Sequence, residues 1–225
     1  MEPTLSIVVP VLNEAAGIEA ALRALAPLRA RGAEVIVVDG GSGDATVALS
    51  RPLCDRVVTT PPGRARQMNS GAASAQAELL LFLHADTQLP EGADHLVRRA
   101  LTAGAAWGRF DVRISGRPAM LRLVATLMNL RSRWTGIATG DQALFVTRGA
   151  FERVGGFPDQ PLMEDVEISR RLRALGRPAC LRARVVTSGR RWETRGVWRT
   201  IFLMWRLRWR YWRGTPAHAL AEAYR

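Results

Sequence analysis

The feature that most constrains the fold is the alternation of short apolar runs with helical patterns through the first half of the chain. Apolar runs predict strands, and apolar residues three or four positions apart predict helices. The strands are expected at residues 5–11, 35–38, 57–58 and 79–83, and the helices at 14–28, 44–49 and 65–74. Such alternation predicts an α/β fold with a mostly parallel central sheet and helices on both faces.

The second half of the chain is less regular. Its patterns predict strands at residues 107–114 and 143–147 and helices at 119–131 and 164–175. The chain has no internal repeat and no long linker. With 225 residues it is long enough to bury a substantial core, so we expect a single domain spanning residues 1–225.

The positive charge is large and concentrated. The formal net charge is +12, and residues 190–213 carry eight arginines against one acid, Glu193. Such a balance points to an anionic partner: a nucleotide, a nucleic acid or a membrane surface. The two cysteines form no disulfide framework. Residues 5–10 lack the basic flank of a signal peptide, and no run reaches the roughly 20 apolar residues of a spanning helix. We therefore expect a cytoplasmic protein.

Polar residues follow three of the predicted strands. Asn13 and Glu14 follow the first strand, residues 39–44 follow the second, and residues 84–86 follow the fourth. Ligands of open α/β sheets bind beyond the carboxyl ends of the strands. These three clusters are therefore expected at one ligand-binding edge.

The loop Asp39-Gly40-Gly41-Ser42-Gly43-Asp44 has two interpretations. Its glycines would let the backbone approach a phosphate or ribose closely. An ordinary turn in which Ser42 or Asp44 caps the next helix is an equal alternative. A dinucleotide fingerprint is excluded, because the third glycine is missing and the loop follows the second strand rather than the first.

Two acidic positions also have a structural alternative. Asp86, two residues after His84, could bind a hard cation that holds a diphosphate, or it could cap the helix that Pro90 opens. The pair Glu164 and Asp165 could provide a catalytic carboxylate, or it could simply favour the positive end of a helix.

The C-terminal segment is basic and aromatic. Arg190 and Arg191 suit phosphate, and Trp192 follows them. Further along, residues 195–213 form an amphipathic pattern. Its apolar face comprises Trp198, Ile201, Phe202, Trp205, Trp209 and Trp212. This pattern is typical of a membrane-interface helix, and a terminal helix docked on the core is the equal alternative.

The order of these motifs resembles that of the family 2 glycosyltransferases, which are inverting enzymes of the GT-A fold. The motifs are SIVVPVLNE at residues 6–14, VIVVDGGSGDAT at 35–46, GRARQMNSG at 63–71, HADT at 84–87, GGF at 155–157 and ED at 164–165. The chain looks most like a small bacterial branch associated with radical-SAM and selenoprotein-type domains. The resemblance covers essentially the whole chain.

The resemblance implies a division of labour along the chain. Residues 1–115 would form the nucleotide-sugar-binding half, residues 116–190 the acceptor and catalytic half, and residues 191–225 a basic aromatic C-terminal helix. The nucleotide-diphosphate sugar would meet Pro10, Asn13, Glu14, Asp39, Gly40, Ser42, Arg66, Asn69, His84, Ala85, Asp86, Arg190 and Arg191.

The resemblance also implies a divalent metal, Mg²⁺ or Mn²⁺. Asp86 matches the last aspartate of the family's DxD motif, which meets the metal. His84 occupies the place of the first aspartate and supplies no negative charge. This departure affects the metal's affinity and identity.

For catalysis, Asp165 matches the family's catalytic aspartate, with Glu164 as its neighbour. An inverting transfer needs such a base to take the proton of the attacking hydroxyl. The leaving diphosphate would be stabilised by the metal, Arg190 and Arg191. The acceptor side would include Asp141, Gln142 and Trp192. The acceptor is unknown; our hypothesis is a lipid-linked one, reached by contact of residues 195–213 with the inner membrane face.

Three rival functions have distinct signatures. A nucleotidyltransferase should carry a glycine-rich loop with a basic residue after the first strand, where this chain has Asn13 and Glu14. A nucleic-acid-binding module would leave the acidic clusters unexplained, so no nucleic acid partner is expected. An inactive nucleotide-binding scaffold stays open because of His84.

Overall fold

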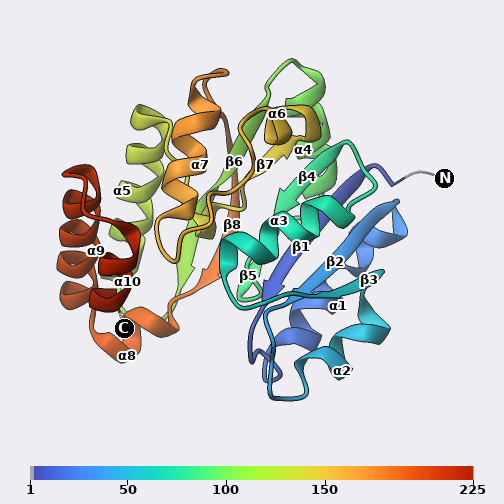
Figure 1. Cartoon of the computed structure of the whole chain (residues 1–225), viewed down its shortest axis with the longest axis horizontal. Coiled ribbons are helices and arrows are strands. Elements are labelled where there is room, and N and C mark those ends of the chain that lie inside the picture. The colour runs from blue at the N-terminus through green and yellow to red at the C-terminus, as the bar shows by residue number, and fades with distance from the viewer. Residues whose placement is uncertain (1–2, 225) are drawn as a thin grey trace.

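The computed structural model describes residues 3–224, in which eight strands form one sheet in the order β3-β2-β1-β4-β7-β6-β8-β5 (Figure 1). The strands are β1 (Leu5–Val11), β2 (Ala33–Asp39), β3 (Arg56–Thr59), β4 (Leu79–Phe82), β5 (Thr87–Gln88), β6 (Trp107–Ser115), β7 (Phe145–Thr147) and β8 (Ala179–Ser188). The helices are α1 (Ile18–Ala30), α2 (Thr46–Ser50), α3 (Arg64–Ser74), α4 (Ala93–Thr102), α5 (Met120–Thr135), α6 (Arg148–Arg153), α7 (Glu164–Arg173), α8 (Arg190–Arg195), α9 (Val197–Trp212) and α10 (Ala217–Tyr224), with short 3₁₀ turns η1 (Arg51–Leu53) and η2 (Gly140–Gln142).

The sheet is mixed, which corrects the prediction of a mostly parallel one. Strands β3, β2, β1 and β4 are parallel, as the alternation in the first half requires. Beyond β4, strand β7 runs antiparallel to both β4 and β6, and β5 runs antiparallel to β8, while β6 and β8 are parallel. Helices also separate the strands of the second half, α5 between β6 and β7 among them, yet β7 runs antiparallel to β6, so alternation alone did not predict the strand direction there.

Helices cover both faces of the sheet, as predicted. Side chains alternate across β1, so Ile7 and Val9 pack with buried residues of α1, α4 and α5. Val8 points to the other face, where it packs with α3, α6 and α7. The carboxyl ends of β1, β2 and β4 therefore open between two helical layers.

A further layer, formed by α9 and α10, covers the loop before α7. Leu207 of α9 and Leu220 of α10 are fully buried against Met163, the residue before the predicted catalytic pair. Among the described residues, no helix combines the length and apolar character needed to cross a membrane. The C-terminal segment is thus partly anchored to the body of the protein through one face of α9.

Candidate functional site

The loops after β1 and β2 are tied together by side-chain hydrogen bonds. Asn13, whose φ is +54°, accepts the backbone N–H of Gly43 on its Oδ1 at 2.9 Å. In return, the backbone N–H groups of Asn13 and Glu14 donate to the hydroxyls of Ser42 (2.9 Å) and Thr46 (2.8 Å). The first two polar clusters predicted from the sequence therefore form one structural unit.

Asp39 shapes this unit from inside. Its carboxylate is 2% exposed and accepts the backbone N–H groups of Gly41 and Ser42, each at 3.0 Å. The hydroxyl of Ser42 donates to the other carboxylate oxygen. Asp39 thus forms a local turn of the kind that aspartate favours, and its contact with a nucleotide base stays a prediction. Gly40 directly follows β2, and its N–H donates to the carbonyl of Val11, the last residue of β1, at 3.0 Å.

Pro10 is the second-last residue of β1 and pairs with Val38 of β2. The pairing of β1 with β4 ends at Val8. A half-buried proline is therefore tolerated at position 10, because no carbonyl of β4 needs a backbone N–H from that position. Pro10 therefore marks the point where β1 and β4 separate and the sheet edge opens.

One face of α3 leads from the sheet into the site. Gly71 packs so close that a Cβ there would come within 2.3 Å of a side-chain methyl of β1. One turn earlier, the buried amide of Gln67 donates to the carbonyls of Val11 (2.7 Å) and Val38 (2.8 Å), which joins the ends of β1 and β2. Arg64, three residues before Gln67, lies on the same helical face.

Arg64, rather than Arg66, reaches the acidic residues of the site. Its Nη1 lies 3.4 Å from Oε1 of Glu164. The guanidinium of Arg66 is instead paired with the exposed Asp159 at 2.9 Å. Both Arg64 and Gln67 were missed by the sequence analysis, although their three-residue spacing was available as a signal.

Asn69 also has a structural partner. Its amide accepts the backbone N–H of Phe157 at 2.9 Å and donates to the carbonyl of the same residue at 2.8 Å. The predicted Gly155–Gly156 loop is thereby fastened to α3. Contact of Arg66 or Asn69 with a nucleotide stays a prediction.

His84 follows β4 and lies against the turn η2. The ring is mostly buried, and its Nδ1 lies 3.7 Å from Oδ1 of Asp141. The residue before Asp141 must be small, because a Cβ on Gly140 would lie only 2.4 Å from the imidazole. The N–H of Gly140 donates to Oδ2 of Asp165 at 2.9 Å, so a single turn joins His84, Asp141 and Asp165.

Asp141 is held as an anion by this environment. Burial acts to raise its pKa, but His84, Arg64 and Arg191 together lower the pKa of Asp141 below its ordinary value. Arg191 comes from α8, far along the chain, and it also stacks 3.8 Å over the ring of Tyr224. The predicted acceptor-side aspartate and a predicted phosphate-binding arginine therefore lie in one cluster.

Glu164 and Asp165 begin α7 directly after Met163, which has a left-handed φ of +65°. Glu164 is 3% exposed. Burial is the largest cause raising the pKa of Glu164, Asp165 raises it further, and Arg64 opposes both. The two carboxylates thus differ: Glu164 is buried beside a cation, whereas Asp165 is held by the backbone of the turn that carries Asp141.

A second group of charged side chains lies around Asp86, which is exposed in the loop after β4. Burial raises the pKa of Glu14, Arg190 lowers it, and Asp86 and Asp44 raise it again. Arg190, Asp86 and Asp44 are therefore each close enough to act on the charge of Glu14. Ala85 packs against the core and keeps Asp86 directed away from it.

The residues around Asp86 fit a metal ion that is coordinated mostly by a bound phosphate-containing molecule and only partly by the protein. The described part of the chain contains no cluster of three or more histidine, cysteine, aspartate or glutamate side chains able to hold an ion by themselves. Mg²⁺ in phosphate-handling sites is commonly held by one or two carboxylates together with phosphate oxygens. Asp86 offers such a carboxylate: it is exposed, and among the described residues its side chain accepts a long hydrogen bond of 3.3 Å from the hydroxyl of Thr87.

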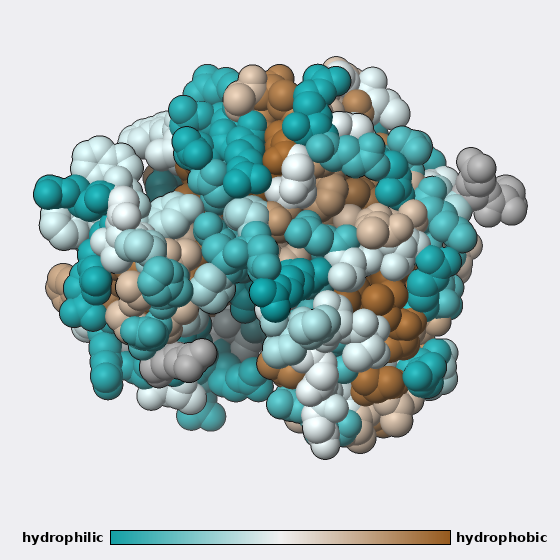
Figure 2. Space-filling model, in the orientation of Figure 1, coloured by the Kyte–Doolittle hydropathy of each residue, from teal (hydrophilic) through white to brown (hydrophobic). Residues whose placement is uncertain are grey.

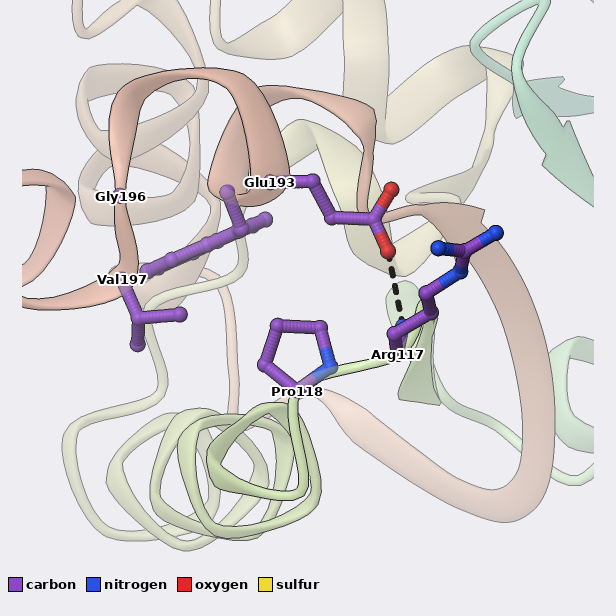
Figure 3. A pocket seen from close by; sticks show the side chains of 6 residues that line it. Arg117, Pro118, Glu193, Gly196 and Val197 are labelled. Atoms are coloured by element: carbon purple, nitrogen blue, oxygen red, sulfur yellow. Dashed lines mark hydrogen bonds between the residues drawn. The ribbon is translucent and has the colours of Figure 1, made fainter.

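Trp192 lies apart from these groups. It is half-buried against the core beside α5, where with Pro118 and Val197 it lines a pocket of about 500 Å³ (Figure 3). Glu193 closes one side of this pocket by accepting the N–H of Arg117 at 2.8 Å. A contact of Trp192 with the acceptor stays a prediction.

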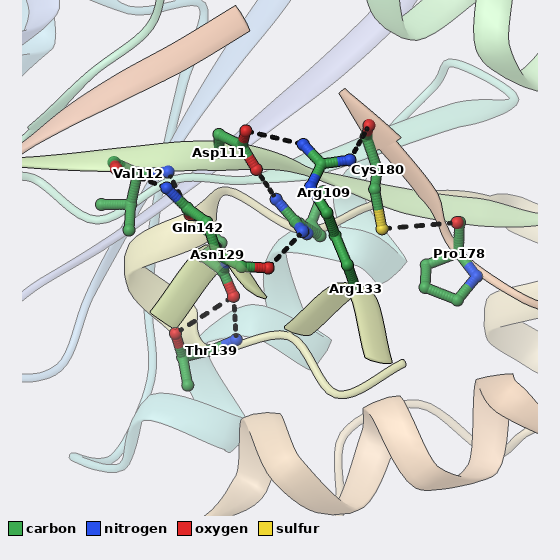
Figure 4. Close-up of polar contacts among 9 residues, drawn as sticks. All are labelled: Arg109, Asp111, Val112, Asn129, Arg133, Thr139, Gln142, Pro178 and Cys180. Carbon is green, nitrogen blue, oxygen red and sulfur yellow. Dashed lines mark hydrogen bonds and ion pairs between the residues drawn. The ribbon is translucent and has the colours of Figure 1, made fainter. Parts of the chain in front are cut away.

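A buried polar network supports the turn η2 from below (Figure 4). Arg109 is fully buried and pairs with Asp111, which also accepts from Arg133 at 2.6 Å. Arg109 donates to the carbonyl of Asn129, and the Asn129 side chain accepts from the amide of Gln142 at 3.4 Å. Gln142, predicted on the acceptor side, is 0% exposed and therefore positions the turn from within.

The sequence is similar to those of known glycosyltransferases. Residues 6–153 match the model of the family described as Glycosyl transferase family 2. The chain is 28% identical over 238 residues to the probable glycosyltransferase YdaM of Bacillus subtilis, covering 94% of this chain and 55% of that protein. It is 32% identical over 173 residues to a PGL/p-HBAD biosynthesis glycosyltransferase of Mycobacterium bovis, covering 69% of this chain and 63% of that protein.

Solved structures share the fold. The mannosyltransferase PcManGT of Pyrobaculum calidifontis, in complex with GDP-Man and Mn²⁺, has a TM-score of 0.63 at 23% identity over 83% of this chain and 57% of its own. TarS 1-349 of S. aureus, in complex with UDP, has a TM-score of 0.66 at 18% identity over 82% of this chain and 60% of its own. The chain thus spans little more than half the length of the proteins it resembles.

Proposed function

Because the chain belongs to glycosyl transferase family 2, we propose that it transfers a sugar from a nucleotide-diphosphate sugar to an acceptor hydroxyl by an inverting displacement. The observation that carries this proposal is that the loop after β4 links two charged groups, since it contains Asp86 and also His84, which contacts Asp141. Asp86 belongs to the first group and Asp165 to the second. A donor diphosphate beside the first group would place its sugar toward the second.

Asp165 is the proposed general base. The N–H of Gly140 occupies one lone pair of Oδ2, and the N–H of Val166 donates to Oδ1 at 2.8 Å, so the carboxylate is oriented by backbone on both sides. In the displacement, the acceptor oxygen forms the new bond to the anomeric carbon while its proton passes to Asp165. The bond from that carbon to the diphosphate breaks on the opposite face.

The leaving diphosphate is proposed to be stabilised by Arg190 and Arg191, with Asp86 holding a divalent metal, Mg²⁺ or Mn²⁺. Such an ion neutralises the charge that develops on the leaving group. The bound Mn²⁺ and GDP-Man of PcManGT, and the bound UDP of TarS, support a donor of this class. His84 stands in the place of a second carboxylate, and its contact with Asp141 gives it the role of orienting the acceptor side.

The acceptor is proposed to be lipid-linked, with the protein cytoplasmic and peripheral on the inner membrane face. The support is the apolar and arginine-rich character of α9, which is discussed below. The narrower resemblance to the branch associated with radical-SAM and selenoprotein-type domains, and the division at residues 115 and 190, stay predictions.

The experiment is a thermal-shift panel of nucleoside diphosphates with and without Mn²⁺ or Mg²⁺, on the wild type and on Asp86→Ala. A ligand at a hundredfold its dissociation constant should stabilise the wild type by about 2.7 kcal/mol. We expect one nucleoside diphosphate to act, to require metal, and to lose its effect in Asp86→Ala. Arg23→Ala is the matched control, because its surface ion pair with Glu19 lies on α1 and involves no predicted site residue. A panel without any shift would favour an inactive scaffold.

A further inference from the structure

The exposed apolar side chains of the protein are gathered on two helices. Among the described residues, ten large apolar side chains are exposed, and only Leu12 lies outside α5 and α9. The other nine are Leu123, Leu127, Leu130, Trp134, Trp198, Phe202, Trp205, Trp209 and Trp212. Contiguous exposed apolar surface on this scale marks an interaction site.

Each set follows helical spacing. On α5, the positions 123, 127, 130 and 134 recur every three or four residues, and on α9 the positions 198, 202, 205, 209 and 212 do the same. Each therefore forms one stripe along its helix. The opposite face of each helix is buried, through Leu121 and Ala125 on α5 and Leu207 on α9, so both stripes lie on the solvent side.

The two stripes border a common pocket of about 560 Å³. It is lined by Arg131 of α5 and by Phe202, Trp205, Arg206, Arg208 and Trp209 of α9. Arg131 lies within one turn of Leu127 and Trp134. In Figure 2, the side of the molecule that carries α9 and α10 shows hydrophilic residues in teal among near-white and tan ones. The helices therefore form one surface rather than two separate ones.

The charge of this surface has one sign. Residues 120–135 and 197–212 include seven arginines and no acid. Within residues 3–224, Nε and Nη2 of Arg131 are inaccessible to solvent and have no hydrogen-bond partner. Burial lowers the pKa of Arg131, and Asp165 is the charge that opposes this effect. An anion in the pocket would compensate this desolvated cation, two of whose nitrogens have no hydrogen-bond partner among the described residues.

We propose that α5 and α9 together form a docking face for an anionic lipid bilayer, with the Arg131 pocket receiving a lipid headgroup phosphate. Tryptophan prefers the bilayer interface, and arginine is attracted by anionic headgroups. This surface goes beyond a membrane contact through α9 alone, since α5 supplies four apolar side chains and the buried cation. It deepens the proposed function, because Asp165 is near enough to act on Arg131, but the docking itself does not depend on a donor.

The test is co-sedimentation of the full chain with vesicles of phosphatidylcholine containing one-third phosphatidylglycerol, and with pure phosphatidylcholine vesicles, at low and high salt. We expect binding to the anionic vesicles that weakens with salt. Leu127→Ser with Trp134→Ser on α5, and Trp205→Ser with Trp209→Ser on α9, should each weaken it about tenfold or more. Arg131→Gln should reduce the preference for anionic vesicles, and Leu12→Ser, the exposed leucine elsewhere, should change nothing.

If the surface formed by α5 and α9 binds a partner other than a bilayer, the same variants give different results. If the α5 variant binds vesicles as well as the wild type, the bilayer does not contact α5 and the proposal is wrong. If the wild type ignores vesicles but self-associates, and the α5 variant stays monomeric in sedimentation velocity, the occupant is a second copy of the chain. The thermal shift with a nucleoside diphosphate, measured on the same variants, keeps this outcome separate from a failure of the proposed function.

Discussion

At the residue scale, Asp165 provides the sharpest test of the chemistry. Asp165→Asn keeps an oxygen that can accept the N–H of Gly140 but removes the group that takes a proton. We expect transfer to fall by about 10²- to 10⁴-fold, the usual contribution of a general base. The measurement is release of nucleoside diphosphate from the donor identified by thermal shift.

The same variant should bind the nucleoside diphosphate and metal as tightly as the wild type, because Asp165 does not belong to the Asp86 group. Loss of binding together with activity would mean that Asp165 supports the fold of the turn rather than the reaction. Glu167→Gln, two residues further along α7 and paired with Arg170, is a suitable control with activity expected near that of the wild type.

Some residues around the candidate site could be predicted from the sequence, and others could not. The loops that follow strands pointed to Asp39 and Asp86, because the edge of a sheet is a property of the local pattern. Asp165 was predicted instead from the acidic start of a helix and from the resemblance. Arg66 was favoured over Arg64 on the resemblance alone, although helical spacing places Arg64 with Gln67 on the face toward the sheet. The network of Arg109 and Asn129 could not be predicted, since its partners are joined only by tertiary packing.

At the element scale, helix α7 carries two glutamates whose pKa shifts have opposite signs. Burial raises the pKa of Glu164 above its ordinary 4.5, so the folded state binds more protons than the unfolded one. Its contribution to stability therefore falls as the pH rises above 4.5 and through the raised folded value. We expect Glu164→Gln, which cannot ionise, to gain stability over the wild type across that pH range and to match it at lower pH.

Glu167 should behave in the opposite way. Its hydrogen bond with Arg170 is the largest cause lowering the pKa of Glu167, so its contribution is present above 4.5 and is lost as the pH falls through the lowered folded value. Glu167→Gln should cost up to about 1 kcal/mol at neutral pH, because Arg170 is largely exposed and Arg171 is partly exposed. Thermal melts of both variants from acid to neutral pH test this, and variants that shift in the same direction would contradict it.

The element scale explains the correction to the sheet as well. The parallel half follows from strand-helix alternation, which the sequence displays as far as β4. The direction of β7 depends instead on how η2 and its buried support bring the chain back beside β4. Turns of this kind leave no periodic signal in the sequence. The strands of the second half could therefore be predicted, but their directions in the sheet could not.

At the scale of the whole molecule, the net charge of +12 is distributed unevenly, with an acidic site at the sheet edge and arginines on the C-terminal helices. The donor site and the docking face use different elements. The donor group is built from the loops around Asn13, Asp39 and Asp86 together with Arg190, whereas the docking face is built from α5 and α9. Two ligands should therefore leave two separate footprints.

Hydrogen exchange can show both footprints on one protein. A nucleoside diphosphate with metal should slow exchange in residues 13–15, 40–44, 84–87 and 189–191, where backbone amides lie in loops or at the first residues of β5 and α8. Anionic vesicles should slow exchange in α5 and α9 instead, because docking opposes the local opening of these helices. Asp86→Ala should erase the first footprint and keep the second, and Trp205→Ser with Trp209→Ser should do the reverse. If vesicles protected the nucleotide loops as strongly as the helices, the charge of the donor site rather than the apolar stripes would govern membrane binding.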